Sequence, residues 1–178
     1  TVQMRDSVAP TANTGLASAG MSATTFAFRL GSIGSCRAEG GAEAANNRSS
    51  STKLTIKPST NGFKSWIKFD ISSLDVSSLA SAILTISLHE DESGSNSIDV
   101  SAVNDSYTTN IGWTDADLTW NNAPGNDTGS VPNLNTGQTT YVNTVNVNNG
   151  LAGDSFNIDI LSILQADTDG IVQFVLHD

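Results

Sequence analysis

The sequence predicts an all-β fold, a β-sandwich, from three features. Ser, Thr, Asn and Gly are abundant and aromatic residues make up only 6% of the chain, a composition typical of secreted all-β proteins. About seven or eight short runs alternate apolar and polar residues, with turn-forming Gly, Pro and Asn between them. No long amphipathic helix is indicated. The 178 residues suffice for one domain with its own core.

The N-terminal part of the chain gives the weakest signals. Residues 1–25 are small and polar, and predict a linker or an entry segment. Residues 25–30 alternate enough for a strand, with Arg29 on the side opposite its phenylalanines. Residues 31–52 show no periodicity and predict a long loop. The single cysteine, Cys36, excludes an internal disulfide and a cysteine-based zinc cluster.

Residues 53–70 predict a β-hairpin that carries the functional face. Two alternating runs, 53–57 and 64–70, flank a segment of turn-forming residues. Because strand side chains point alternately to opposite faces, one side is apolar and is expected in the core: Leu54, Ile56, Ile67 and Phe69. The other side is expected to face solvent, and it carries cations with one tryptophan: Lys53, Thr55, Lys57, Lys64, Trp66 and Lys68.

The rest of the chain predicts further strands separated by turns. Residues 81–88 alternate cleanly, and we expect them to form a second hairpin with residues 98–103. Residues 104–138 show little alternation and predict an extended loop region that contains Trp113 and Trp120. Further strands are predicted at 141–147, 156–160 and 172–176, with one helical turn at 161–166. The pattern alone leaves jelly-roll and Greek-key strand orders open.

Charge is distributed unevenly along the chain. The net charge is −10, yet all eight Lys and Arg residues precede residue 69. Only three acids oppose them there, and the other fifteen acids follow. Such asymmetry indicates a polar interaction surface without naming its ligand. The alternative is a solubilising surface whose lysines neutralise nearby acids.

Several segments resemble a known family. The strings KSWIKFDISSL, SAILTISL, IDVSAV and W-T-D-x-x-L-T-W-N-N-A-P are similar to the DNRLRE-type domain, which is related to disaggregatase repeats, and to the carbohydrate-binding-module family in which alginate binders have been described. The resemblance is most specific at Phe69–Asp70 and from Trp113 to Pro124. It implies one jelly-roll β-sandwich over residues 26–178 that binds glycan without cleaving it, appended to a secreted polysaccharide-degrading enzyme.

The resemblance also implies a binding site. The basic positions of the family fall here on Arg29, Lys57, Lys64 and Lys68. We expect further contacts from the other cations in this part of the chain: Lys53, Arg48 and Arg37. Trp66 is expected to offer a platform for a sugar ring, with packing beneath a neighbouring loop as the alternative. Trp113 and Trp120 are expected to hold the long loop onto the sandwich.

The chemistry of these residues favours an acidic polysaccharide, with uronic acid or sulfate groups, such as alginate or another algal glycan. A strand places same-face cations about 7 Å apart, which suits repeated anionic groups, and charge-assisted hydrogen bonds are the strong ones. We expect a monomeric, secreted or cell-surface module. No nucleic-acid partner is expected because the net charge is −10, and no apolar run is long enough to cross a bilayer.

Other functions stay open at this point. The sequence contains two histidines and none of the nucleophile-elbow, zinc-protease or phosphate-loop motifs. A polysaccharide lyase or a glycoside hydrolase remains an alternative because eighteen acids permit many carboxylate pairs. A cell-surface adhesion or matrix module is a third possibility. No cofactor is required, although the acidic clusters at 90–92 and at Asp167 and Asp169 could hold a structural Ca²⁺.

Overall fold

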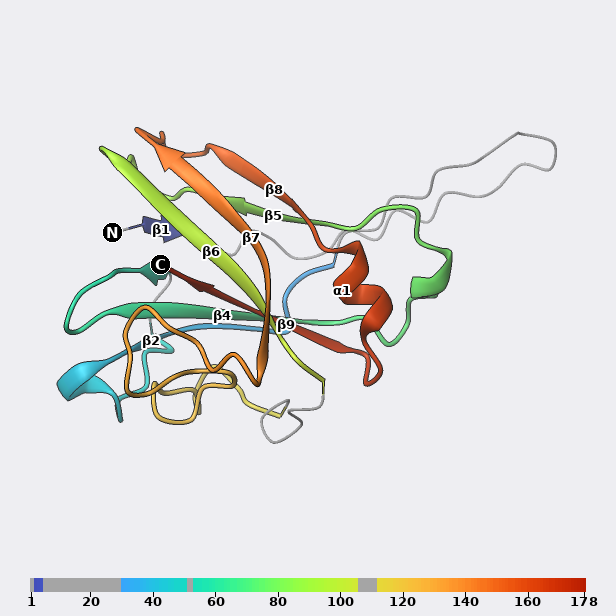
Figure 1. Ribbon diagram of the computed structural model, residues 1–178, viewed down its shortest axis with the longest axis horizontal. Coiled ribbons are helices and arrows are strands. Elements are labelled where there is room, and N and C mark those ends of the chain that lie inside the picture. Colours follow the sequence, from blue (N-terminus) through green and yellow to red (C-terminus); the bar gives the residue numbers. More distant parts are fainter. Residues whose placement is uncertain (1, 5–29, 51–52, 106–111) are drawn as a thin grey trace.

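Antiparallel strands in two packed layers form the structure, a computed structural model that describes residues 2–4, 30–50, 53–105 and 112–178 (Figure 1). This confirms the predicted all-β sandwich. The strand predicted at residues 25–30 falls almost wholly outside the described residues, and so does Arg29. Within the described part of the chain, no helix is long and apolar enough to cross a membrane.

One layer is a five-stranded sheet in the order β2-β4-β9-β6-β7. Its strands are β2 (Gly34–Glu39), β4 (Phe63–Asp70), β9 (Ile171–His177), β6 (Ser95–Val103) and β7 (Thr139–Asn148). The inner face of this sheet is mainly apolar, because buried aliphatic or aromatic side chains alternate along β9 and along parts of β6 and β7, as in Ile98, Val100 and Phe174. This periodicity is what the sequence pattern detects.

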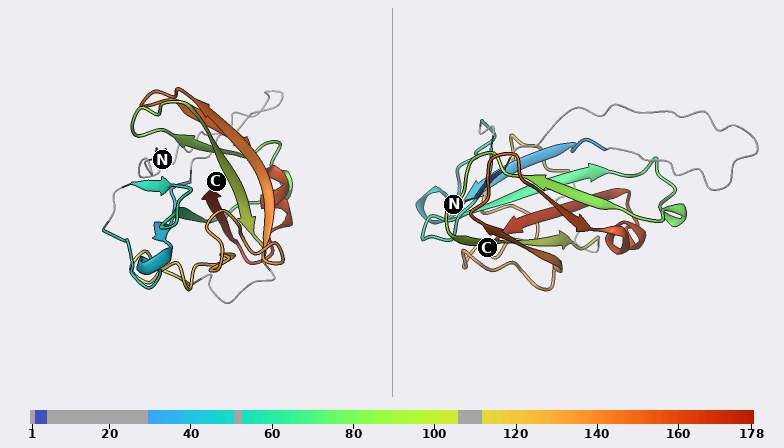
Figure 2. Two further views of the ribbon diagram at one scale, coloured as in Figure 1. Left: turned by 60° about the vertical axis from the view of Figure 1, so that its left-hand side comes forward. Right: turned by 90° about the horizontal axis from the view of Figure 1, so that it is seen from above.

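The other layer consists of two shorter ladders. In one, β1 (Val2–Met4) pairs with β3 (Leu54–Ile56), and in the other, β5 (Ile83–Ser87) pairs with β8 (Ser155–Asp159). The main core lies between the layers, and the predicted inward residues Leu54, Ile56, Ile67 and Phe69 all belong to it or pack against it. The helical turn predicted at 161–166 is confirmed as α1 (Leu161–Ala166). Figure 2 shows the two layers from the side. Two short 3-10 helices complete the fold, η1 (Gly41–Glu43) and η2 (Val76–Ser78).

Residues 112–138, here called the covering loop, pack against the outer face of the five-stranded sheet and form a second core there. This core is built from small residues of β2, from Trp66 and Val175 of the sheet, and from the loop itself: Cys36, Ala38, Trp66, Val103, Trp113, Leu118, Trp120, Ala123, Leu134 and Val175. The extended loop region predicted from the lack of periodicity is therefore an ordered layer with buried tryptophans.

Both predicted hairpins are wrong in their pairing. Strand β3 pairs with β1; its backbone pairing with β4 is limited to the bridge between Lys57 and Phe63, and further along the Ser65 side chain hydrogen-bonds the Thr55 backbone. Strand β5 pairs with β8, while β6 pairs with β7 and β9. The physical reason is the same in both places. Alternation shows which face of a strand is buried, but in a sandwich successive strands can pass to the opposite layer, and the hydrophobic pattern is unchanged when they do.

Strand β2 was expected to be loop, because its buried side is made of small residues. Gly34, Cys36, Ala38 and Gly40 alternate along one face and are all buried. A Cβ atom on Gly40 would lie 3.1 Å from the Trp120 ring, and one on Gly34 would lie 3.2 Å from the Trp113 ring. The small residues therefore make room for two indoles, and the usual signal of bulky alternating residues is absent.

Replacing Gly40 tests this packing. Gly40 has an extended backbone with φ −83°, which valine also adopts, so Gly40→Val should lower the free energy of unfolding by about 1–3 kcal/mol through overpacking against Trp120. Urea denaturation measures the change. Gly112→Ala is the control, because a Cβ there meets nothing within 4 Å, and it should be near neutral. Equal stability of Gly40→Val and the parent would contradict the packing described here.

Candidate functional site

The predicted site residues separate into two groups, and the first lies under the covering loop. Lys64, Trp66 and Lys68 share the outer face of β4 as expected, but their exposed fractions are only 1%, 0% and 6%. The expectation that they face solvent is therefore wrong, because the covering loop closes over this face of the sheet. The alternative stated for Trp66, packing beneath a neighbouring loop, is confirmed.

Lys64 is held entirely by the covering loop. Its Nζ donates to Asn126 Oδ1 at 2.7 Å, to the Ser130 carbonyl at 3.2 Å and to the Asn133 carbonyl. The same ammonium lies 4.5 Å from the centroid of the Trp120 ring, a cation–π contact. Burial lowers the pKa of Lys64 to about 8, and nearby Asp127 opposes that shift. Loop carbonyls and an indole thus replace the water around this charge.

Trp66 and Lys68 hold the loop at two further points. The Trp66 Nε1 donates to the Pro124 carbonyl at 2.9 Å. The Lys68 Nζ donates to the Trp113 carbonyl and lies 4.5 Å from the centroid of the Trp113 ring, and burial lowers its pKa while Asp115 raises it. Lys64, Trp66 and Lys68, here called the β4 row, therefore anchor the loop along its length. The two segments that carried the family resemblance most specifically, KSWIKFD and Trp113 to Pro124, contact each other.

Other contacts complete this attachment. The Trp113 Nε1 donates to Gln173 Oε1 of β9 at 2.7 Å. Asn47 donates from Nδ2 to the carbonyls of Asp115 and Leu118, each at 2.7 Å. Trp113 and Trp120 are 7% and 2% exposed. Their expected role in holding the long loop onto the sandwich is confirmed.

The second group of predicted residues is partly exposed at the β2 side of the molecule. Arg37, Arg48, Lys53 and Lys57, here called the basic edge, lie on β2, on the segment after η1, and on either side of β3. Lys57 is the bridge partner of Phe63, and Phe63 is in register with Glu39. Because partners across antiparallel strands share a face, Lys57 and Glu39 flank the partly exposed Phe63, and Arg48 reaches this place through its pair with Glu39.

Contacts within the basic edge fix the arginines. The Arg37 Nη1 donates to Thr55 Oγ1 at 2.7 Å, and its Cζ lies 4.8 Å from the centroid of the Phe63 ring. The Arg48 Nη2 pairs with Glu39 at 2.5 Å and with Glu43 at 2.9 Å, and Lys53 pairs with Glu90. Among the described residues, no ion pair involves Lys57.

The two arginines of the basic edge repel each other and, among the described residues, keep unpartnered Nε donors. The pKa of Arg37 is lowered first by burial and next by repulsion from Arg48, while Glu39 raises it. In the described part of the chain, the Nε of Arg37 and the Nε of Arg48 are buried without a hydrogen-bond acceptor. The mutual repulsion of the two guanidinium groups is an electrostatic environment that favours a nearby anion.

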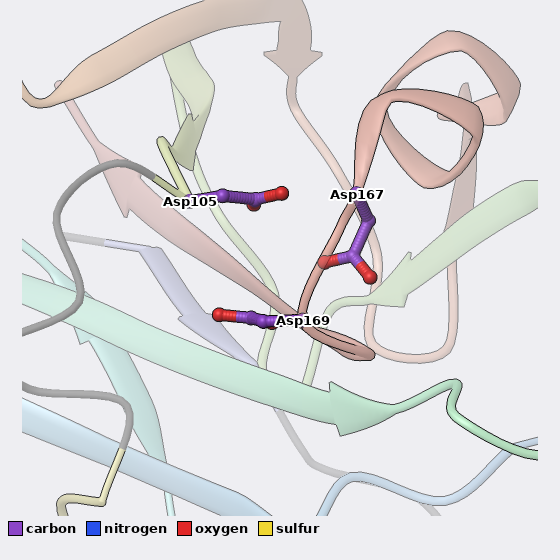
Figure 3. A group of neighbouring side chains, drawn as sticks. All are labelled: Asp105, Asp167 and Asp169. Atoms are coloured by element: carbon purple, nitrogen blue, oxygen red, sulfur yellow. The ribbon is translucent and has the colours of Figure 1, made fainter.

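Acidic residues gather at the end of the sandwich where β6 ends and β9 begins. Asp105, Asp167 and Asp169, here called the acidic triad, can each offer an oxygen such that the three atoms lie within 4.8 Å of one another (Figure 3). One oxygen of each carboxylate accepts a backbone N–H, from Thr168, Gly170 and Ile171 respectively. The remaining oxygen of Asp167 is buried with no partner among the described residues. Burial raises the Asp167 pKa, and Asp105 and Asp169 add to that rise.

The triad fits a hard cation with oxygen ligands, and we propose that it holds a structural Ca²⁺. Asp167 and Asp169 were candidates from the sequence, whereas Asp105 was not, because it is distant in the chain and only the end of β6 brings it close. The other candidate cluster, residues 90–92, forms no such group in the described part of the chain. There Glu90 pairs with Lys53, and Asp91 accepts the Ala152 N–H at 2.8 Å.

Calcium should therefore raise the melting temperature of the domain, because an ion that binds only the folded state stabilises it by mass action. Differential scanning calorimetry with CaCl₂ and then with excess EDTA measures the effect. Asp167→Asn should abolish the calcium response, and Asp91→Asn, in the excluded cluster, should retain it. An identical melting temperature with calcium and with EDTA would contradict a calcium site here.

Titration of Lys64 gives a second prediction. The Lys64 pKa is about 8 in the folded protein and 10.5 in the absence of perturbation, so the unfolded chain binds more protons between these values. The free energy of unfolding contributed by this group therefore rises with pH across that window. Lys64→Met should remove this rise, as measured by urea denaturation from about pH 7 to about pH 10.5. Lys57→Met is the matched control. If the stability of Lys64→Met changed with pH in the same way as that of the parent, the lowered pKa assigned to Lys64 would be contradicted.

Comparison with known proteins agrees with this architecture. Residues 38–177 match carbohydrate-binding module family 96, a range that runs from within β2 to the last residue of β9 and includes the covering loop. No curated protein matches the chain. Since the matched range is well over half of the 178 residues, the chain belongs to carbohydrate-binding module family 96.

Proposed function

We propose that this module binds an acidic polysaccharide, one that carries uronic acid or sulfate groups, through the basic edge. We further propose that it directs an attached secreted enzyme to that polysaccharide. Family membership supports a saccharide ligand. The acidic part of the proposal is supported by Arg37 and Lys57 at the partly exposed Phe63, with Arg48 close by at Glu39.

The side chains of the basic edge suit such a ligand in different ways. The guanidinium groups of Arg37 and Arg48 present planar forks that match a carboxylate or a sulfate, while Lys57 supplies a mobile point charge. The Phe63 ring, already in contact with Arg37, offers an apolar surface beside the charges. An anionic group placed between the two arginines would also relieve the repulsion that lowers the Arg37 pKa.

Existing ion pairs do not close this surface. Arg48 is bound by Glu39 and Glu43, and Lys53 by Glu90, but these pairs are partly exposed. Exposed pairs contribute only about 0–1 kcal/mol each, so an oxygen of the ligand can replace Glu43 or Glu90 at little cost, whereas the less exposed Glu39 keeps its pair with Arg48. Lys64 and Lys68 are not part of the proposed binding site, because their ammonium groups already donate hydrogen bonds to the covering loop.

The catalytic alternative has less support. A retaining glycosidase needs two carboxyl groups about 5–5.5 Å apart and an inverting one needs about 6.5–9.5 Å. The three acidic-triad carboxylates are each held by a backbone N–H group on one oxygen, and we propose that they hold a structural cation. An adhesion or matrix role would use the same glycan contacts, and it differs only in what the module is attached to.

Substitution in the basic edge tests the binding site. Arg37→Gln and Lys57→Gln should each weaken binding to alginate or carrageenan about tenfold, because each removes a charge-assisted hydrogen bond. Affinity gel electrophoresis and calorimetry measure this, and circular dichroism checks the fold. Glu43→Gln is the opposite control: it removes one of the two carboxylates that pair with Arg48 and should strengthen binding.

Salt should weaken the same interaction, since exposed charges are screened over about 8 Å at physiological ionic strength. Unchanged affinity in the Arg37→Gln, Lys57→Gln double variant would reject the basic edge as the site. Release of reducing ends or unsaturated products from these polysaccharides would instead establish an enzyme.

A further inference from the structure

A polar surface with an exposed aromatic ring lies on the outer face of β6 and β7. The residues on this face, here called the β6–β7 platform, are Ser97, Asp99, Tyr141, Thr144, Asn146 and Asn148. Ser97 is in register with Asn146, and Asp99 with Thr144. Their chain neighbours Ile98, Val100, Val145 and Val147 are buried in the main core, so the platform residues point away from it.

The covering loop leaves this platform open. The loop reaches His177 of β9, whose Nδ1 lies 3.1 Å from the Pro132 carbonyl, and on β6 it packs against Val103 at the end of the strand. Figure 1 shows the start of β6 and the end of β7 extending away from the yellow-to-orange loop. Tyr141 is 60% exposed, and Asn146 and Asn148 are exposed as well.

A β-bulge sets the position of the aromatic ring. The register shifts between Val100 and Ser101, so that Tyr141 pairs with Ser101 and Asn143 pairs with Val100. The extra residue, Val142, packs against the main core, and Tyr141 and Thr144 come to the same face. Bulges often re-aim a side chain in this way next to binding sites.

Hydrogen bonds hold the Tyr141 side chain in place. The Thr144 hydroxyl donates to Asp99 Oδ1 at 2.5 Å, so the Tyr141 hydroxyl is the donor in its 2.8 Å contact with Thr144. An exposed ring that is already ordered loses little conformational entropy when a ligand stacks on it. The ring therefore has the properties of a preformed stacking surface, although nothing in the core requires it to be there.

From these observations we propose that the β6–β7 platform is a second carbohydrate-binding surface, which takes uncharged sugar residues. A pyranose ring would stack on Tyr141, and the amides of Asn146 and Asn148 supply donors and acceptors for its hydroxyl groups. Charge selects the ligand class, because the chain has no Lys or Arg after residue 68 and Asp99 repels an anionic polymer.

This second surface lies at the opposite edge of the sheet from the basic edge. Strand β7 is one end of the five-stranded order and β2 is the other. The proposal therefore rests on membership of a carbohydrate-binding family and not on the acidic ligand proposed above. A polysaccharide with both charged and neutral stretches, or two adjacent chains, could engage both edges and gain avidity.

Titration of the ¹⁵N-labelled domain with neutral hexasaccharides tests this proposal, with cellohexaose, mannohexaose and neoagarohexaose as probes and hexamannuronate as the charged counterpart. At least one neutral probe should shift the amides of residues 95–99 and 141–148. Tyr141→Ala should then lower its affinity about tenfold, whereas Tyr141→Phe should bind within about twofold of the parent, since stacking remains.

Arg37→Gln is the matched control and should leave the neutral probe unaffected. The proposal is overturned if no neutral probe shifts the platform at millimolar concentration, if Tyr141→Ala binds as the parent does, or if hexamannuronate shifts the platform. Loss of hexamannuronate binding in Arg37→Gln concerns the basic edge alone, so the two proposals fail independently.

Discussion

The structure depends on the attachment of the covering loop to β4. Three alternate residues of one strand, Lys64, Trp66 and Lys68, reach outward and bind carbonyl oxygens of a loop that has no regular secondary structure. Burying two ammonium groups is costly unless each is fully hydrogen bonded. Here backbone carbonyls and the faces of Trp120 and Trp113 provide that compensation, so the lysines and the loop fold require each other.

This attachment determines where a ligand can bind. A sandwich module could use the broad outer face of its larger sheet, but the covering loop occupies that face over β2, β4, β9 and the end of β6. What remains are the two edges of the sheet. The β2 side carries Arg37 and Arg48, with Lys57 beside the start of β4, and the β7 edge carries Tyr141 among neutral polar groups and Asp99. Because the basic residues all lie in the first part of the chain, the basic edge lies at one side of the sheet, and the strands at the other edge contain no Lys or Arg.

Much of the fold could be predicted because alternation reports burial. The runs around Ile56, Ile67, Ile86, Val100 and Phe174 all face the main core as expected. Strand pairing could not be predicted, since the same alternation fits either layer. Strand β2 was missed because Ala38 and its neighbours are small, and they are small because Trp113 and Trp120 lie over them.

The candidate site was harder to predict for a related reason. Periodicity placed Lys64 and Lys68 correctly on the face opposite the core, yet it contains no information about a loop that folds back from residues far along the chain. A single sequence does not distinguish a lysine that binds a backbone carbonyl from a lysine that binds a ligand. Asp105 and Phe63 were overlooked because only the tertiary fold brings them to Asp167 and Arg37.

The most direct test of the central claim compares Lys68→Met with the parent in two measurements on the same sample, amide hydrogen exchange and affinity for alginate. If Lys68 holds the covering loop and does not contact glycan, exchange in residues 112–138 becomes faster while affinity stays the same. Unchanged amide exchange together with lost affinity for alginate would show that Lys68 binds the glycan, and would contradict the structural role assigned to the β4 row.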